Sequence, residues 1–511
     1  MLNKIKDPKI KVISNAVITY GKMALLIGIS LYTVRELLNN LGIDNYGIFT
    51  LSAGLITVFT FLNAAMSIST QRYLSFHQGT NKPDMQNNVF ITSLILHFLI
   101  GIITISILFS ILPILFSGVL EIEPKFIDDA KTLYICMIFT LFFTIISVPF
   151  VATLFSRENI LFDSIILILQ ALLKLIAAKL IGFYPDSEKL STYGFFLVII
   201  SGITCCFYVF YCCLCYPECR IKKQTRCKGL LKEMSHFAGW NLYTNLCYVL
   251  NTQGLNIILN IFLGTKINAA YGIASQVNGQ VRELSLSLLR ALNPQIMKSE
   301  GMEKRERMVR LSMLASKVGF FLVSIVAIPA ILSMPKILEL WLNMVPDFTS
   351  NICIFLLFAS IINQLTVGIN SAIQAIGNIK EFQLIIGTVA LITLPTSFFL
   401  LKAGNSIYSV LILMILIEIL TSFIKLFFFS RLCNISIKKY FTECIFRTTL
   451  SLLISTTLGY FLVSRIDLNN NWFTPFVIMF IIYPPIFYLI GFGKYEKSSF
   501  QKIISNIKSK F

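Results

Sequence analysis

Residues 91–116 read ITSLILHFLIGIITISILFSILPILF, a run without a single Asp, Glu, Lys or Arg. A helix needs about 20 mostly apolar residues to cross the hydrocarbon core of a bilayer, and this run is long enough. It is much longer than the roughly 9–11 residues of a transmembrane β-strand. The stretch therefore predicts a membrane-spanning helix.

Apolar runs of this kind extend from one end of the chain to the other. The protein has 511 residues, of which 56% are hydrophobic and 13% are charged. Because soluble domains carry about 25% charged residues, this composition excludes an ordinary soluble enzyme, a disordered protein and a disulfide-stapled secreted module. We predict an all-α polytopic membrane protein with fourteen transmembrane helices, at 12–38, 43–72, 86–117, 128–155, 160–183, 192–216, 236–263, 268–297, 308–333, 347–376, 380–401, 405–430, 441–464 and 472–491.

The basic residues divide unequally between the two sides of this predicted topology. The termini and the even-numbered loops, counted together with the adjoining ends of the spans, hold 27 Lys and Arg, and the opposite loops, counted in the same way, hold seven. Basic residues concentrate in cytoplasmic loops, so both termini are expected in the cytoplasm. Residues 1–11 are basic, but no small-residue cleavage pattern follows them, and we expect the first helix to remain in the mature protein.

A short motif occurs twice. Leu41-Gly42, three residues and Tyr46-Gly47-Ile48 follow the first predicted helix, while Leu263-Gly264, six residues and Tyr271-Gly272-Ile273 follow the seventh. Both copies fall in loops on the outer side. The two halves of the chain would therefore run parallel, related by an axis along the membrane normal.

Polar side chains form stripes on several predicted helices. On the seventh helix they recur every three or four residues, at Asn241, Asn245, Tyr248, Thr252, Asn256 and Asn260. The second helix offers Thr60, Asn63, Ser67 and Thr70. Polar groups within a bilayer face protein or water, so we expect helices 1, 2, 7, 8 and 10 to line a hydrated cavity. The alternative is that these groups only join neighbouring helices by hydrogen bonds.

Arg72, Lys131, Arg310 and Lys380 lie near the ends of predicted spans and are counted with the adjoining loops. Nine other basic residues fall within predicted spans, namely Lys22, Arg35, Lys174, Lys179, Arg282, Arg290, Lys317, Lys425 and Arg447. The acids there are chiefly Glu36, Glu283 and Glu418. Arg282 follows Tyr271 by about eleven residues, or some 16 Å along a helix. That depth is mid-membrane, where an unpaired Arg costs at least about 2.5–3.5 kcal/mol. Lys22 lies nearer the cytoplasmic face and could snorkel to it.

Several cations around a wet cavity predict an anionic ligand. Phosphate or pyrophosphate suits both Arg and Lys, and Asn side chains suit sugar hydroxyls. Lys22, Lys174, Arg282 and Arg290 are the expected pyrophosphate-binding residues, and the expected sugar-binding residues are Asn63, Asn241, Asn245 and Asn256. Glu418 and Lys425, two turns apart on the twelfth helix, share a face and are candidates for ion coupling.

The sequence lacks recognisable motifs for nucleotide hydrolysis or catalysis. It has no GxxxxGK[ST], no HExxH and only three histidines, so we expect neither ATP hydrolysis nor catalysis. Seven cysteines crowd into 205–227 without a clean CxxC pair or a nearby His, which favours packing over metal binding. We expect no cofactor, no metal and no nucleic acid; the positive charge needs only anionic lipid headgroups as partners.

The first predicted hairpin resembles a known family. The segments LGIDNYGIF at 41–49 and QRYLSFHQG at 71–79 are similar to those of the Wzx-type polysaccharide and O-antigen flippases, within the superfamily that includes the MATE exporters. The resemblance implies rocker-switch alternating access around a central cavity. It also implies a six-helix bundle at 1–216, a basic cytoplasmic linker at 217–235, a second six-helix bundle at 236–430, and two further helices with a basic tail at 431–511.

The resemblance further implies a substrate, a polyprenyl-pyrophosphate carrying an oligosaccharide unit. The sequence thus predicts a flippase in the inner, cytoplasmic membrane that supplies surface polysaccharide (O-antigen or capsule) assembly, with polysaccharide polymerase machinery as a partner. The main alternative is a MATE-like ion-coupled exporter of drugs or other small molecules. A membrane glycan polymerase would need a larger outer loop with catalytic groups, and a scaffold would not need a mid-membrane Arg.

Overall fold

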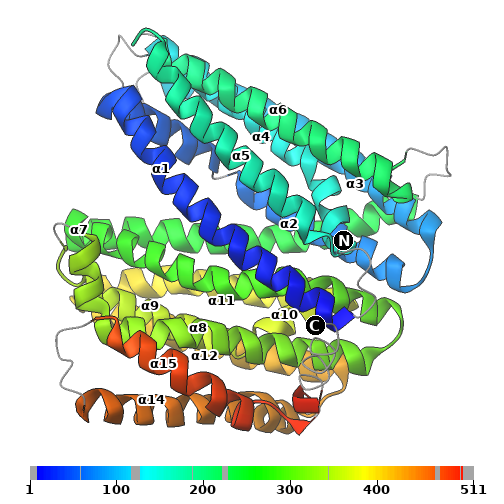
Figure 1. Ribbon diagram of the computed structural model, residues 1–511, viewed down its shortest axis with the longest axis vertical. Helices are drawn as coiled ribbons and strands as arrows, with labels where there is room; N and C mark the ends of the chain where they lie inside the picture. Colours follow the sequence, from blue (N-terminus) through cyan, green and yellow to red (C-terminus); the bar gives the residue numbers. More distant parts are fainter. Residues whose placement is uncertain are drawn as a thin grey trace, which may run out of the picture. The chain divides into compact units, whose positions relative to one another are not determined.

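The computed structural model describes residues 8–57, 59–116, 127–186, 188–220, 228–342, 345–465, 472–494 and 496–498. Every regular element among them is helical (Figure 1). Ten of these described helices are long and apolar enough to cross a membrane, or eleven if the bent pair α9 (Thr349–Gln364) and α10 (Val367–Ile376) forms one span. The protein is therefore an all-helical, multi-pass membrane protein, while the count of fourteen spans stays a prediction.

The chain divides into two compact units, which consist chiefly of Lys11–Asn245 and Leu246–Phe511. The division falls within α7 (Lys228–Gly301), so its first turns belong to the first unit and its remainder to the second. The bundle boundaries expected at 216 and 236 stay predictions.

The first unit is built around α4. Its helices are α1 (Pro8–Thr57), α2 (Thr60–Gly79), α3 (Pro83–Ile114), α4 (Ile127–Ser156), α5 (Ile160–Leu180) and α6 (Lys189–Cys215), with short 3-10 turns at Ile181–Phe183 and Pro217–Cys219. α4 packs against α2, α3 and α6. Its side chains Leu133, Tyr134 and Ile138 are fully buried, because apolar groups that face neighbouring helices are shielded from both water and lipid.

The second unit is built around α8 (Arg305–Trp341), which packs against α9, α10 and α15. The unit continues with α11 (Lys380–Lys402), α12 (Ile407–Cys433), α13 (Ile437–Tyr440), a π-helical turn at Phe441–Phe446, α14 (Arg447–Arg465), α15 (Thr474–Ile486) and a π-helical turn at Phe487–Gly491. α10 and α8 approach very closely at Gly368, whose amide donates to Ser316 Oγ at 2.9 Å. A Cβ there would lie 2.0 Å from the carbonyl oxygen of Ser312, so only glycine fits.

Both copies of the Leu-Gly motif interrupt a helix in the same way. Gly42 breaks α1 with φ 76° and ψ 171°, and Gly264 breaks α7 with φ 80° and ψ 178°. This region of backbone space is essentially restricted to glycine. No atom lies within 4 Å of an added Cβ at either position, so the requirement is conformational and not steric. The breaks fall where the sequence predicts the first and the seventh spans to end.

Buried polar contacts join α15 and the segment that follows it to α8. Lys317 on α8, which is 2% exposed, places its Nζ 2.6 Å from Glu496 Oε1. The hydroxyl groups of Tyr483 and Ser324 lie 3.0 Å apart. These contacts join the end of the described chain to α8.

Candidate functional site

A charged cluster lies within the second unit, where α7, α9 and α12 contribute side chains. Glu418 and Lys425 stand two turns apart on α12, and Lys425 Nζ lies 3.9 Å from Glu418 Oε1. The same Oε1 accepts a hydrogen bond of 2.6 Å from Asn363 Nδ2 on α9. Lys425 is 2% exposed and Glu418 is 24% exposed, so the carboxylate is the more accessible partner. The two residues share a face of α12, and the ion-coupling role expected of them stays a prediction.

Arg282 belongs to the same cluster. It lies on the second part of α7, within electrostatic range of both Lys425 and Tyr248. Within the residues that the structure describes, Arg282 has no hydrogen bond or ion pair of its own, and its side chain is exposed. The cluster therefore holds two cations and one carboxylate, and one guanidinium stays available to a ligand.

Arg290, two turns beyond Arg282 on α7, has a partner. Its Nη2 lies 2.6 Å from Glu283 Oε1, and both side chains are only partly buried. Residues seven apart on a helix are almost aligned, which explains why Glu283 pairs with Arg290 and not with its sequence neighbour Arg282. Arg290 could still bind an anion, but it would do so beside a carboxylate.

Other polar groups of α7 join neighbouring helices. Ser360 Oγ donates to Asn278 Oδ1 at 2.6 Å, and Ser371 Oγ donates to Asn293 Oδ1 at 2.6 Å. Asn241 is 2% exposed, and its Nδ2 donates to the carbonyl oxygen of Phe237 at 3.0 Å. At Asn278 and Asn293 the helix-joining alternative describes the contacts, whereas the Asn241 hydrogen bond lies within α7 itself. Asn245 and Asn256 are partly buried.

Lys22 lies in the first unit and is paired there. Its Nζ lies 3.2 Å from Asp163 Oδ2 in the first turn of α5, and the two side chains are 6% and 4% exposed. Tyr208 on α6 donates its hydroxyl proton to Asp163 Oδ1 at 3.1 Å. The sequence analysis missed Asp163, although a carboxylate within the apolar run at 160–183 was a signal for a buried basic partner.

For the two remaining predicted site residues, Lys174 and Asn63, the structure gives the position but no contacts of the side chain. Lys174 is partly buried on α5. The backbone of Asn63 lies in α2, but its side chain is outside the described part of the structure. Among the described residues no group of three or more His, Cys, Asp or Glu could hold a metal ion.

Comparisons of the whole chain with solved structures identify its fold. A multidrug resistance MATE family transporter of the MOP superfamily, in an outward-facing conformation, superposes with a TM-score of 0.72 at 14% identity, over 84% of this chain and 96% of that one. The chain has the MATE fold.

Two further MATE-fold structures agree. One MATE in a straight conformation has a TM-score of 0.70 at 15% identity and covers 85% of this chain and 97% of its own. A MOP superfamily transporter from Pyrococcus furiosus has a TM-score of 0.70 at 14% identity, over 84% of this chain and 96% of its own; its binding pocket is described as reversed in polarity, which suggests a different function. No protein-family model and no curated protein matches the sequence.

Proposed function

We propose that this protein is a flippase that moves polyprenyl-pyrophosphate-linked oligosaccharide units from the inner to the outer leaflet of the cytoplasmic membrane, by alternating access. The MATE fold supports transport as the activity. The resemblance of the segments at 41–49 and 71–79 to polysaccharide flippases supports the substrate class.

The observation that carries this proposal is the sign of the charge at Arg282. A cation exporter needs an excess of acid around its ligand, whereas Arg282 and Lys425 outnumber Glu418. The free guanidinium would bind a pyrophosphate oxygen pair in the bidentate geometry that Arg favours. Lys22, Lys174 and Arg290 are the further pyrophosphate-binding residues in this proposal, and Asn63, Asn241, Asn245 and Asn256 would bind sugars.

Glu418 gives the same cluster a route to ion coupling. A proton or sodium ion on Glu418 would weaken its attraction for Lys425 and leave two unbalanced cations beside the substrate. An ion that binds Glu418 would therefore raise the affinity for an anion at Arg282, and the anion would raise the affinity for the ion by the same factor.

The proposed topology places both termini in the cytoplasm and the basic segment 217–235 at the inner surface. Substrate would enter from the inner leaflet, where lipid-linked sugars are assembled. Polysaccharide polymerase machinery on the outer side would consume the product.

A second candidate is an ion-coupled exporter of small molecules. It is supported by the similarity to a structure described as a multidrug resistance transporter, and by the two acids Asp163 and Glu418 within the units. Asp163, however, is already neutralised by Lys22.

The test is a profile of lipid-linked oligosaccharides in a strain that lacks the gene, with the leaflet assigned by lectin access. We expect complete units to accumulate facing inward, and the wild-type gene to relieve this. Arg282→Ala should lower the rate of relief about 10- to 100-fold, because a charge-assisted hydrogen bond contributes about 1.5–3 kcal/mol.

Two variants control that experiment. Arg282→Lys keeps the charge and should retain part of the activity. Arg431→Ala removes an exposed Arg paired with Glu381 and should have no effect. Normal amounts of lipid-linked oligosaccharide and intact surface glycan in the deletion strain would refute the flippase proposal and favour the exporter.

A further inference from the structure

A small apolar groove opens within the first unit, and none of its lining residues belongs to the charged pairs described above. Its volume is about 170 Å³, comparable with the roughly 150 Å³ cavity that holds a benzene molecule in an engineered protein. The groove is lined by residues of α2, α3 and the first turns of α7, namely Met66, Leu96, Ile100, Ser235, Ala238, Gly239 and Leu242.

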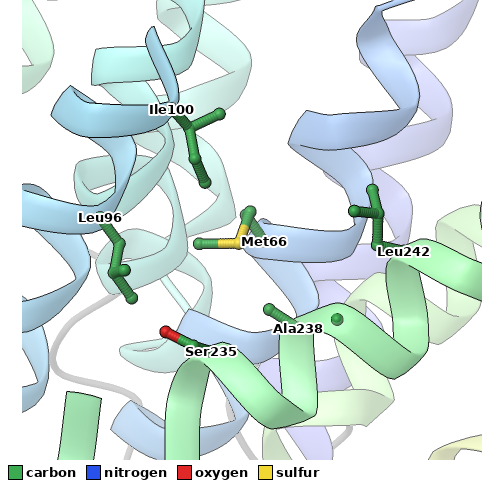
Figure 2. Close-up of a pocket in the computed structure, with 7 residues that line it drawn as sticks. Met66, Leu96, Ile100, Ser235, Ala238 and Leu242 are labelled. Carbon is green, nitrogen blue, oxygen red and sulfur yellow. The ribbon is translucent and has the colours of Figure 1, made fainter. Parts of the chain in front are cut away.

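Figure 2 shows how these side chains meet. Leu96 and Ile100 of α3 face the opening from one side, Met66 of α2 lies at its centre, and Ala238 and Leu242 of α7 border the other side. Ser235 contributes the one hydroxyl among the lining side chains. A groove of this composition suits a hydrocarbon chain and not a sugar.

Glycine shapes the wall of the groove that α7 contributes. A Cβ on Gly239 would meet no atom within 4 Å, so the backbone there borders open space. Next to it Ala238 carries only a methyl group. Ala238 and Gly239 thus form a notch, a stretch of the wall with no side chain larger than a methyl group, which leaves room for the methyl branches of an isoprenoid chain.

The groove lies in the cytoplasmic half of the proposed topology. Ser235 and Leu242 follow Lys228, where α7 begins, by about 10 Å and 21 Å at 1.5 Å per residue. Leu96 and Ile100 follow Pro83, where α3 begins, by about 20 Å and 26 Å. The groove therefore runs from near the cytoplasmic end of α7 to about the middle of α3, which corresponds to the inner leaflet down to the bilayer centre.

Positive charge stands at the cytoplasmic end of the groove. Lys232 precedes Ser235 by one turn on the same face of α7, and its side chain is exposed. Arg72 of α2 stacks on Phe237 of α7, with 4.8 Å between the guanidinium carbon and the ring centroid. Arg72 is only 7% exposed, so Lys232 is the cation that an anionic headgroup at the membrane surface would meet while its chain enters the groove.

We propose that this groove holds the first isoprene units of a polyprenyl phosphate, whose phosphate lies beside Lys232. The proposal rests on the proposed flippase function and adds a second contact to it, for the lipid chain of the substrate. The groove would hold the chain in the inner leaflet while the headgroup enters the protein.

The test is photo-crosslinking of the full-length protein in nanodiscs, with a benzophenone side chain at Leu96 and a tritiated polyprenyl phosphate as the probe. The matched control carries the benzophenone at Phe98, which has the same depth on α3 but points away from the groove and is 50% exposed. We expect at least about fourfold more labelling from position 96, the ratio that corresponds to the burial of one CH₂ group. Unlabelled polyprenyl phosphate should compete, and dioleoyl phosphatidic acid should not.

Two glycine variants sharpen the experiment. Gly239→Leu fills the notch without a backbone clash and should reduce the labelling from position 96 by at least about fourfold. Gly229→Leu adds the same side chain in open space on the same helix, outside the groove, and should leave the labelling unchanged.

Equal labelling from positions 96 and 98, or equal competition by phosphatidic acid, would overturn the proposal and make the groove a site for ordinary lipids. Normal translocation by wild type without specific labelling would refute the groove alone and leave the flippase intact. Saturable, Gly239-dependent labelling without translocation would support the groove and refute the flippase.

Discussion

The buried pair between Lys22 and Asp163 allows a sharp test of the first unit. Both side chains are at most 6% exposed, and the carboxylate also accepts a hydrogen bond from the hydroxyl of Tyr208. Removal of one charge leaves the other buried without compensation, which typically costs about 3–5 kcal/mol. Removal of both leaves no buried charge and is often neutral.

We therefore expect Lys22→Met and Asp163→Asn each to destabilise the protein by about 3 kcal/mol or more. For a unit of this size such a loss lowers Tm by roughly 6–12 °C. The double variant should be more stable than either single variant. Arg431→Ala, which breaks an exposed pair with Glu381, should lower Tm by less than about 4 °C.

The measurement is thermal unfolding of the four purified proteins in one detergent, followed by size-exclusion profile and intrinsic fluorescence. The coupling between the two residues is the difference between the double variant and the sum of the singles. Additive losses, with the double variant the least stable of all, would refute the ion pair.

Two further predictions concern the backbone break and the C-terminal helices. Gly42→Ala should lower the free energy of unfolding by about 1–3 kcal/mol, because alanine cannot adopt φ 76° with ψ 171° without strain. In the same thermal assay the control Gly47→Ala, also in open space but without a positive φ, should be close to wild type. Equal effects of the two substitutions would contradict the conformational explanation. Lys317→Met should expose α14 and α15 to faster hydrogen exchange, because it leaves Glu496 without its buried partner; unchanged exchange there would show that the ion pair does not hold these helices.

Local features of the fold were predictable from the sequence. The apolar runs mark the long helices, since burial in lipid requires about 20 apolar residues whatever the neighbours are. The breaks at Gly42 and Gly264 follow from the recurring Leu-Gly motif. The second part of α7, after Gly264, is harder to recognise as a span from the sequence, because it is too polar for its hydropathy to indicate one.

Side-chain partners were predictable only within one helix. The pairs Glu418–Lys425 and Glu283–Arg290 both join residues seven apart, so helix geometry alone brings them to one face. Lys22 and Asp163 are 141 residues apart, and no local rule connects them. The position of Asp163 near the N-terminus of α5 favours an acid electrostatically, but it does not identify the cation.

The pairing of the other cations narrows the proposed anion site. Among the residues that the structure describes, acids pair at close range with three of the nine basic residues within predicted spans: Asp163 with Lys22, Glu283 with Arg290 and Glu496 with Lys317. Lys425 shares Glu418 with Asn363 at the longer distance of 3.9 Å. Within the described part of the chain, Arg282 stands beside that pair without an acid of its own. An anion that binds at this cluster would therefore gain most from Arg282, and its removal should weaken transport more than removal of Lys22, whose loss should act first on stability.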